Sequence, residues 1–282
     1  MIDKVSEITV EDLIAEEDMA VTISHSGYIK RSPISLYRSQ HRGGKGKRGM
    51  GVKEADFVQS LFVASTHDTL LFFTTAGKAH WLKVHQIPQV GRASRGKAVV
   101  NLLSLASAER LTAILSLKEF SDGHYITLAT RNGVVKKVDI MAFSHPRSGG
   151  IVAINLDPED ELIAAKLTDG EQDLFLTTQL GKAIRFSESD IRPMGRSARG
   201  VRGISISKND RVVGMEVVED DKSILVVTEQ GYGKRTFTSA YRRQGRGGKG
   251  LITVRITQRN GVIVAVRHVS EDDDLMVVTD EG

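Results

Sequence analysis

The sequence predicts an all-β protein, built as a propeller-like ring of about 50-residue repeats with four strands in each. Two glycine markers recur in step along the chain, and short β-prone runs stand at fixed distances from both. Long amphipathic helix patterns are absent, and only residues 10–15 could form a short helix. The 282 residues, 40% hydrophobic and 26% charged, are enough for a folded domain with its own core.

The first marker is a turn in which threonine or serine precedes glycine by three residues. Its glycines are Gly27, Gly77, Gly133, Gly181, Gly231 and Gly282. Strand-length apolar runs end in these turns, as in 70–73, 125–128, 173–176 and 224–227. Asn132-Gly133 is a strong hairpin signal because a type I′ turn needs positive φ. We therefore expect a β-hairpin at each first-marker glycine.

The second marker is a glycine that follows a basic stretch, at Gly46, Gly96, Gly150, Gly200 and Gly250. Another apolar run follows this glycine and one more precedes the next hairpin, which makes four strands per repeat. Two markers that keep step through five repeats are very unlikely to arise by chance. We expect a lead-in segment, 1–18, and one domain, 19–282. Its approximate repeats are 19–68, 69–121, 122–171, 172–221, 222–272 and a partial 273–282.

The sixth repeat stops at its hairpin turn. Either the N-terminal segment supplies the missing strands and closes the ring, or the chain is a fragment cut within its last blade. We favour the second alternative. The expectation is therefore a six-bladed ring whose last blade is incomplete.

Basic residues gather at one phase of the repeat, although the formal net charge is only +4. The basic stretches are 38–53, 92–97, 192–202 and 234–249, and acidic residues gather between them. A ring places these stretches on one rim, and a curved positive track suits a bent polyanion such as duplex DNA. One such stretch alone would be interpreted as a solvated surface; four in phase favour nucleic-acid binding.

The most specific stretch is Gln40-His41-Arg42-Gly43-Gly44-Lys45-Gly46, which recurs as Gln244-Gly245-Arg246-Gly247-Gly248-Lys249-Gly250. Both resemble the gyrase A box, Gln-Arg-Arg-Gly-Gly-Lys-Gly, in the C-terminal domain of the bacterial DNA gyrase A subunit. His41 and Gly245 stand where that family has arginine. The resemblance covers nearly the whole chain and includes residues 16–22, 27–30, 64–68, 100–103, 209–213 and 231–236.

The resemblance implies a β-pinwheel, a propeller variant whose blades exchange an outer strand and which wraps duplex DNA around its rim. The implied partners are duplex DNA, bound through its backbone with little sequence specificity, and the catalytic core of the gyrase A subunit, through which the ATPase subunit is also a partner. The chain itself is expected to be non-catalytic, without metal or cofactor, monomeric when isolated, and located in the bacterial cytoplasm at the nucleoid. The absence of cysteine suits that compartment.

We expect the DNA-binding residues to follow the basic stretches. They are Gln40, His41, Arg42, Gly43, Gly44, Lys45, Gly46, Lys47, Arg48, Arg92, Arg95, Lys97, Arg196, Arg199, Arg202, Gln244, Arg246 and Lys249.

Several other interpretations are weaker. The equivalent domain of topoisomerase IV is the nearest alternative, but it generally lacks a recognisable box. An enzymatic propeller needs carboxylates that converge on a central channel, and a protein-binding propeller needs an apolar patch. Residues 91–97 have the spacing of a nucleotide-binding loop, yet Ala98 stands where serine or threonine must bind magnesium. We interpret 272–274 as a solvated acidic turn, and His80 and His85 as structural.

Overall fold

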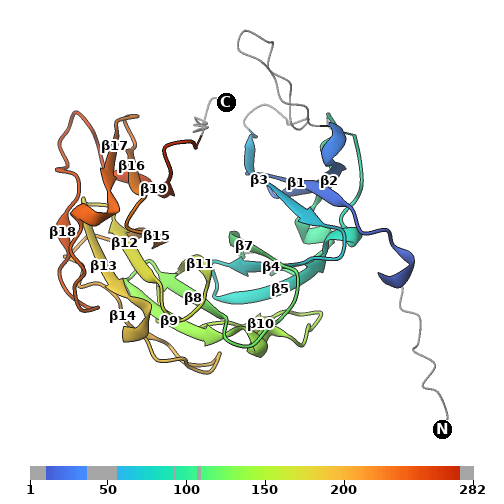
Figure 1. Ribbon diagram of the computed structural model, residues 1–282, viewed down its shortest axis with the longest axis horizontal. Coiled ribbons are helices and arrows are strands. Elements are labelled where there is room, and N and C mark those ends of the chain that lie inside the picture. Colours follow the sequence, from blue (N-terminus) through green and yellow to red (C-terminus); the bar gives the residue numbers. More distant parts are fainter. Residues whose placement is uncertain (1–10, 37–55, 92, 107–108, 274–282) are drawn as a thin grey trace.

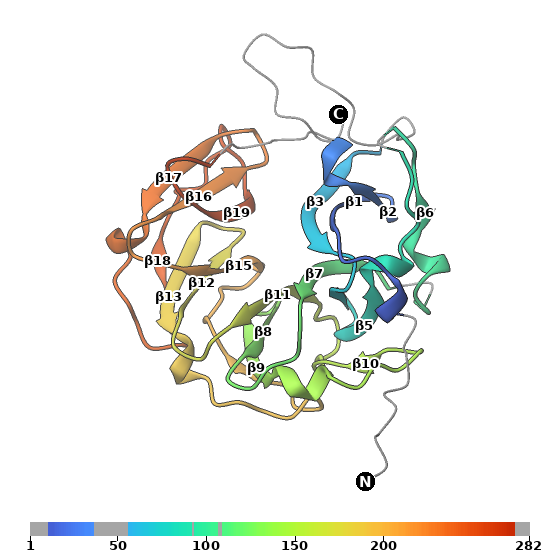
Figure 2. The same ribbon diagram turned by 45° about the vertical axis from the view of Figure 1, so that its right-hand side comes forward.

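The computed structural model describes residues 11–36, 56–91, 93–106 and 109–273. These residues form five small antiparallel sheets, or blades, which follow one another in chain order around a ring (Figure 1, Figure 2). No helix among them is long and apolar enough to cross a membrane. The all-β, propeller-like class is thus confirmed.

The blades share one internal order of strands, from an innermost to an outermost strand. In this order blade 1 is β3 (Val58–Ser65), β1 (Asp18–Ser24), β2 (Tyr28–Pro33) and β6 (Lys97–Ala98). Blade 2 is β7 (Leu111–Leu117), β4 (Thr69–Thr74), β5 (Lys78–Lys83) and β10 (Ile151–Val152). Blade 3 is β11 (Leu162–Thr168), β8 (Tyr125–Thr130), β9 (Val134–Asp139) and β14 (Val201–Arg202). Blade 4 is β15 (Val212–Val218), β12 (Asp173–Thr178), β13 (Lys182–Ser187) and β18 (Leu251–Ile252). Blade 5 has β19 (Ile263–Val269), β16 (Ser223–Thr228) and β17 (Gly233–Phe237).

The helical elements are short 3₁₀ turns. They are η1 (Glu11–Leu13), η2 (Ile34–Leu36), η3 (Val84–Gln86), η4 (Val99–Asn101), η5 (Ile140–Phe143), η6 (Glu188–Asp190) and η7 (Thr238–Ala240). Most of them directly follow the second strand of a hairpin and turn the chain toward the next blade.

Within the described residues the hairpins lie where the first marker predicts them, at Gly27, Gly77, Gly133, Gly181 and Gly231. In blade 3 the Gly133 N–H donates to the carbonyl of Thr130 (3.0 Å), and Gly133 has φ +83°. The Thr130 hydroxyl oxygen accepts the next amide, that of Val134, at 3.2 Å. The threonine therefore closes the turn with its side chain, which explains why it precedes the glycine at a fixed distance.

The outermost strand of blades 1 to 4 comes from the following repeat. In blade 3, for example, Val201 of β14 pairs with Val135 of β9. Gly200, just before β14, has φ +99°, and a Cβ built there would lie 2.6 Å from the carbonyl oxygen of Val135. The second glycine marker thus stands where the chain crosses closely over the preceding blade. The strand order shows the exchange that the resemblance implied.

The expected number of blades is wrong: the described residues form five sheets, not six. The sixth blade rested on one turn at Thr279–Gly282, and residues 274–282 lie outside the described part. A sheet needs several paired strands, and residues 273–282 are too few to supply them.

Apolar residues of neighbouring blades pack against each other and form the core. One cluster joins Leu71 and Phe73 of blade 2 to Ile126 and Leu128 of blade 3. The inner strands β7, β11, β15 and β19 lie next to one another near the middle of the ring, and the exchanged strands lie at its perimeter (Figure 2). This arrangement puts the chain around the described second-marker glycines, Gly96, Gly150, Gly200 and Gly250, at the rim.

Candidate nucleic-acid interface

Four loops lead into the exchanged strands, and we call them the rim loops: 91–96, 145–150, 195–200 and 245–250. Each ends at a second-marker glycine, and the exchanged strand β6, β10, β14 or β18 begins with the next residue. Three of them, with the residues directly beside them, carry the predicted DNA-binding residues of the described part. They place Arg95 and Lys97 at blade 1, Arg196, Arg199 and Arg202 at blade 3, and Gln244, Arg246 and Lys249 at blade 4.

The first box lies outside the described residues, as do Arg48 and Arg92. The residues concerned are Gln40, His41, Arg42, Gly43, Gly44, Lys45, Gly46, Lys47, Arg48 and Arg92. Their role in DNA binding stays a prediction.

Three predicted cations are exposed on the rim. Lys97, Arg202 and Lys249 have exposed side chains that take part in no ion pair with any described residue. They lie on or beside exchanged strands of blades 1, 3 and 4. Their charges are available to a polyanion without the loss of an internal contact.

Three other predicted arginines, Arg95, Arg199 and Arg246, form side-chain contacts within the protein. Arg95 stacks over the ring of Tyr28, with its guanidinium carbon 3.5 Å from the ring centre. Arg199 forms an ion pair with Asp157 at 2.6 Å, and its side chain remains 71% exposed. Such an exposed pair contributes little to stability, so it can open at small cost.

The main chain of the second box is docked on blade 4 and on the end of β14, the outermost strand of blade 3. The Gln244 N–H donates to the carbonyl of Arg185 (2.8 Å), and the Gly247 N–H to that of Gly203 (2.6 Å). Arg246 donates from Nε to the carbonyl of Asp190 at 2.9 Å and from Nη1 to that of Arg202 at 3.2 Å. Arg246 therefore fixes the loop, whereas Lys249 stays exposed on it.

Buried cations form a second group that sequence reasoning missed. Lys30 and Lys136 stand three residues after a first-marker glycine, and both are fully buried. The Lys136 ammonium donates to the carbonyls of Ala153 (2.8 Å), Ala198 (3.0 Å) and Arg196. Burial, with a smaller contribution from the nearby charge of Arg196, lowers the pKa of Lys136 to about 8.

The next position of the repeat carries an N–H donor that reaches the following blade. Arg31 donates to the carbonyl of Ile87 (2.8 Å), Trp81 to that of Phe143 (2.8 Å), and Lys137 to that of Glu188 (3.0 Å). Arg185 donates to the carbonyls of Thr238 (3.3 Å) and Tyr241 (3.5 Å). All four stand four residues after a first-marker glycine, and this fixed spacing is the signal that could have identified them.

Arg185 also anchors a buried ion-pair cluster beneath the second box. Its Nη2 lies 2.7 Å from Asp173, and Arg243, which precedes the box, reaches the same carboxylate at 2.9 Å. The carboxylates of Asp173 and Asp220 hold the pKa of Arg185 above its ordinary value, against the opposing effect of burial. The cluster ties the start of the box to β12 and β13.

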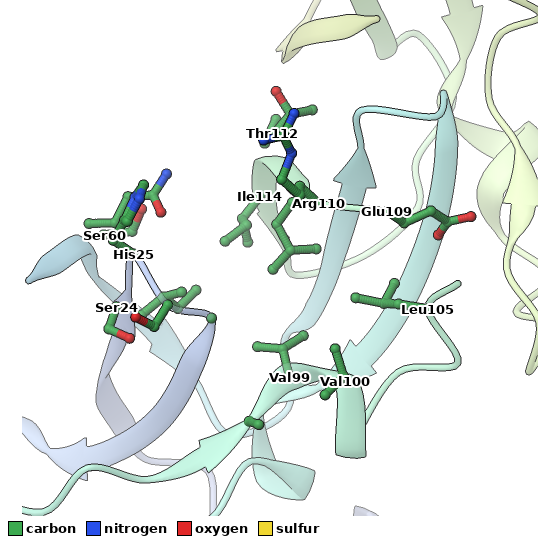
Figure 3. Close-up of a pocket in the computed structure, with 17 residues that line it drawn as sticks. Ser24, His25, Ser60, Val99, Val100, Leu105, Glu109, Arg110, Thr112 and Ile114 are labelled. Carbon is green, nitrogen blue, oxygen red and sulfur yellow. The ribbon is translucent and has the colours of Figure 1, made fainter. Parts of the chain in front are cut away.

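Other polar groups do not assemble into an alternative site. His80 is buried beside Glu109, with 3.5 Å between Nε2 and the carboxylate, as a structural histidine. Within the described residues no three histidine, aspartate or glutamate side chains are placed to hold a metal. A cavity of about 370 Å³ lies between blades 1 and 2, where Val99, Val100 and Ile114 face Ser24 and His25 (Figure 3). Its one carboxylate, that of Glu109, is paired with Lys78 at 2.7 Å.

Comparison with protein families gives one match that spans most of the chain. A family described as "DNA gyrase C-terminal domain, beta-propeller" matches residues 18–65, 68–118, 124–169, 172–219 and 222–270. These are five successive segments, one for each blade.

Curated relatives are DNA gyrase A subunits. That of Halalkalibacterium halodurans is 54% identical over 272 residues, which cover 96% of this chain and 33% of the relative. That of Klebsiella oxytoca is 46% identical over 276 residues, 98% of this chain and 32% of the relative. The chain therefore spans about a third of the length of these relatives.

Two solved structures share the fold at a sequence identity of 26% to 28%. The C-terminal domain of a DNA topoisomerase IV superposes with a TM-score of 0.77 at 28% identity, and covers 92% of this chain and 79% of that one. A DNA gyrase A C-terminal domain gives a TM-score of 0.74 at 26% identity, with 91% and 84% covered.

Proposed function

Because this chain belongs to the DNA gyrase C-terminal domain family, we propose that it binds duplex DNA along its rim and bends the duplex around the ring. The observation that carries the proposal is the shared position of the rim loops, which stand at the perimeter of four successive blades. A DNA segment that follows the perimeter meets them one after another.

The recognition is electrostatic. Lys97, Arg202 and Lys249 offer exposed charges, and each phosphate that they neutralise releases counterions. Backbone contacts carry little sequence information, so preference arises only from how easily a sequence bends. The first box, from Gln40 to Arg48, adds the four positive charges of Arg42, Lys45, Lys47 and Arg48 to this track.

We assign the chemistry of DNA cleavage and ATP hydrolysis to other parts of a larger protein. The relatives are DNA gyrase A subunits, and this chain matches only a third of their length. In this proposal the domain wraps DNA and passes it to the catalytic core of a type II topoisomerase, which works with a separate ATPase subunit.

A second candidate is the equivalent domain of topoisomerase IV, which the TM-score of 0.77 favours. The two functions differ in whether they impose writhe on DNA. A gyrase-type domain wraps DNA with positive writhe, whereas a domain that only captures DNA leaves no net writhe. Ligation of nicked circles in the presence of the chain, followed by topoisomer analysis, separates the two.

Salt titration is the first test. If about six phosphates are neutralised, the affinity for duplex DNA falls by roughly 10³-fold between 50 and 200 mM salt. An affinity that is flat in salt refutes an electrostatic rim.

The second test replaces Arg42, Lys45 and Lys47 by alanine. We expect loss of positive writhe, because these residues carry three of the four positive charges of the box. A charge-matched control replaces Arg110, Lys118 and Lys166, which lie on or beside inner strands. The control should keep wild-type wrapping; equal wrapping by both triple variants would remove the box from the site.

A further inference from the structure

The rim loop 195–200 has an unusual main-chain arrangement. Its carbonyls at three consecutive residues accept hydrogen bonds from the body of the protein. Lys136 donates to Arg196 and Ala198, and the Asn155 side chain donates to Ser197 at 2.6 Å. Lys136 lies on β9 and Asn155 follows β10, so two blades hold the loop from below.

The planar trans peptide fixes the directions of the amide N–H groups in this loop. Within one trans peptide the C=O and the N–H point in opposite directions, and the described residues contain no cis peptide. Because the carbonyls of Arg196 and Ala198 face the Lys136 ammonium, the N–H groups of Ser197 and Arg199 face away from it. Among the described residues, none accepts a hydrogen bond from either amide. The intervening Ala198 N–H closes the turn on Gly195 at 3.0 Å.

Two outward amides beside an arginine side chain are the elements of a phosphate site. Arg199 contributes its guanidinium, which is 71% exposed. We propose that residues 196–200 bind one backbone phosphate of duplex DNA through the Ser197 and Arg199 amides, and that Lys136 is the residue that positions them.

This proposal rests on the proposed function and adds a main-chain contact and a buried organiser to it. A buried lysine also contacts the rim loop of blade 1, although at a different carbonyl. There Lys30, at the matching place in the repeat, donates to the carbonyl of Gly91 at 3.4 Å, and the Ser94 N–H donates to the same carbonyl.

Lys136 also makes the loop sensitive to pH. A protonated amine has three N–H donors for its three carbonyls, while a neutral amine has two donors and a lone pair. The pKa of about 8 puts this change between pH 7 and 9. The charged groups around it are Arg196 and Arg199 on the loop and Asp157 after β10, which is paired with Arg199. Lys137, its neighbour on β9, faces Glu188.

The test compares the whole chain with its Lys136→Met variant. Affinity for a 40-base-pair duplex is measured at pH 7 and pH 9 and fixed salt. We expect a loss of about tenfold at pH 7 in the variant, the worth of one hydrogen bond to a charged group. The wild type should weaken toward the level of the variant at pH 9, and the variant should stay flat. Lys166→Met, on the inner strand β11 of the same blade, is the matched control and should bind like the wild type.

Amide chemical shifts of Ser197 and Arg199 supply a readout that needs no variant. Both should move on addition of duplex DNA and not with millimolar inorganic phosphate. Saturation by phosphate alone would identify a site for a free anion and overturn the assignment to DNA. If the wild type binds DNA but neither amide moves and the affinity is flat from pH 7 to 9, this inference fails while the proposed function stands. If the wild type does not bind DNA, both fail.

Discussion

Replacement of Gly200 by alanine tests the strand exchange on which the rim depends. The added methyl would lie 2.6 Å from the Val135 carbonyl oxygen and 2.9 Å from Cγ1 of Val134. Real Cβ atoms do not approach oxygen so closely, so the chain must move where it crosses blade 3. The φ of +99° adds a second cost, because a side chain disfavours positive φ.

The two costs can be combined into a magnitude. Positive φ costs an alanine roughly 1–2 kcal/mol relative to glycine, and forced overpacking costs about 1–3 kcal/mol. We therefore expect Gly200→Ala to lower the free energy of unfolding by about 2–5 kcal/mol. Gly195, at the other end of the same loop, provides the control. A Cβ there would meet nothing within 4 Å, so alanine should leave stability unchanged or raise it by less than about 1 kcal/mol.

Urea unfolding of the two variants measures the difference, and hydrogen exchange locates it. The amides of β9 and β14 in the Gly200→Ala variant should lose protection, whereas those of β15 in the neighbouring blade 4 and of β16 in blade 5 should keep it. Equal unfolding midpoints for the two glycine variants would refute the close crossing as the reason for the second marker.

Two further predictions concern charge. Asp157→Asn frees Arg199 from its 2.6 Å ion pair, so affinity for duplex DNA should rise by about two- to fivefold, the worth of an exposed pair; a binding titration beside the exposed control Asp169→Asn measures it, and a fall in affinity would contradict the rim assignment. Burial lowers the pKa of His80 from its ordinary value of 6.5, so the unfolded chain binds the proton at a higher pH than the folded chain. The contribution of neutral His80 to the free energy of unfolding is therefore complete above pH 6.5 and falls as the pH drops below that value. Urea midpoints from pH 7 to 5 should therefore decline less in His80→Asn than in the wild type, and parallel declines would show that His80 is not the group responsible.

The sequence allowed the hairpins to be predicted because their chemistry is local. Thr130 and Gly133 contact each other within one turn, and five copies of this pattern reveal the period. The exchanged strands are different. Ile151–Val152 and Val201–Arg202 are two residues long, and their partners lie in the preceding repeat, so no periodicity within the strand reveals them. Their exchange followed only from the resemblance to a family.

The buried cations were missed for a related reason. Lysine is almost never fully buried unless it is paired, so Lys136 in a strand is ordinarily interpreted as surface charge. Two of its partners are main-chain carbonyls of a loop about 60 residues away. Every residue has a main-chain carbonyl, so the residue types of the loop do not reveal these contacts. The blade count failed where a turn motif was taken for the start of a blade without strands to complete it.

The position four residues after a first-marker glycine holds residues of different type that make the same hydrogen bond. Arg31, Trp81, Lys137 and Arg185 differ in charge and shape, but each donates an N–H to a carbonyl at or beside the 3₁₀ turn of the next blade. This position requires a long side chain with an N–H donor. It does not require a charge, since the indole of Trp81 makes the same kind of contact as the guanidinium of Arg31.

The rim positions follow the opposite rule, because exposed charge is all that Lys97, Arg202 and Lys249 offer. The net charge of +4 therefore includes two groups of cations: the exposed ones on the rim and the buried ones that bond to main-chain carbonyls. Loss of a rim cation should reduce the salt dependence of DNA binding by about one phosphate contact. Loss of a buried donor should leave that slope nearly unchanged and instead lower stability or misplace a rim loop.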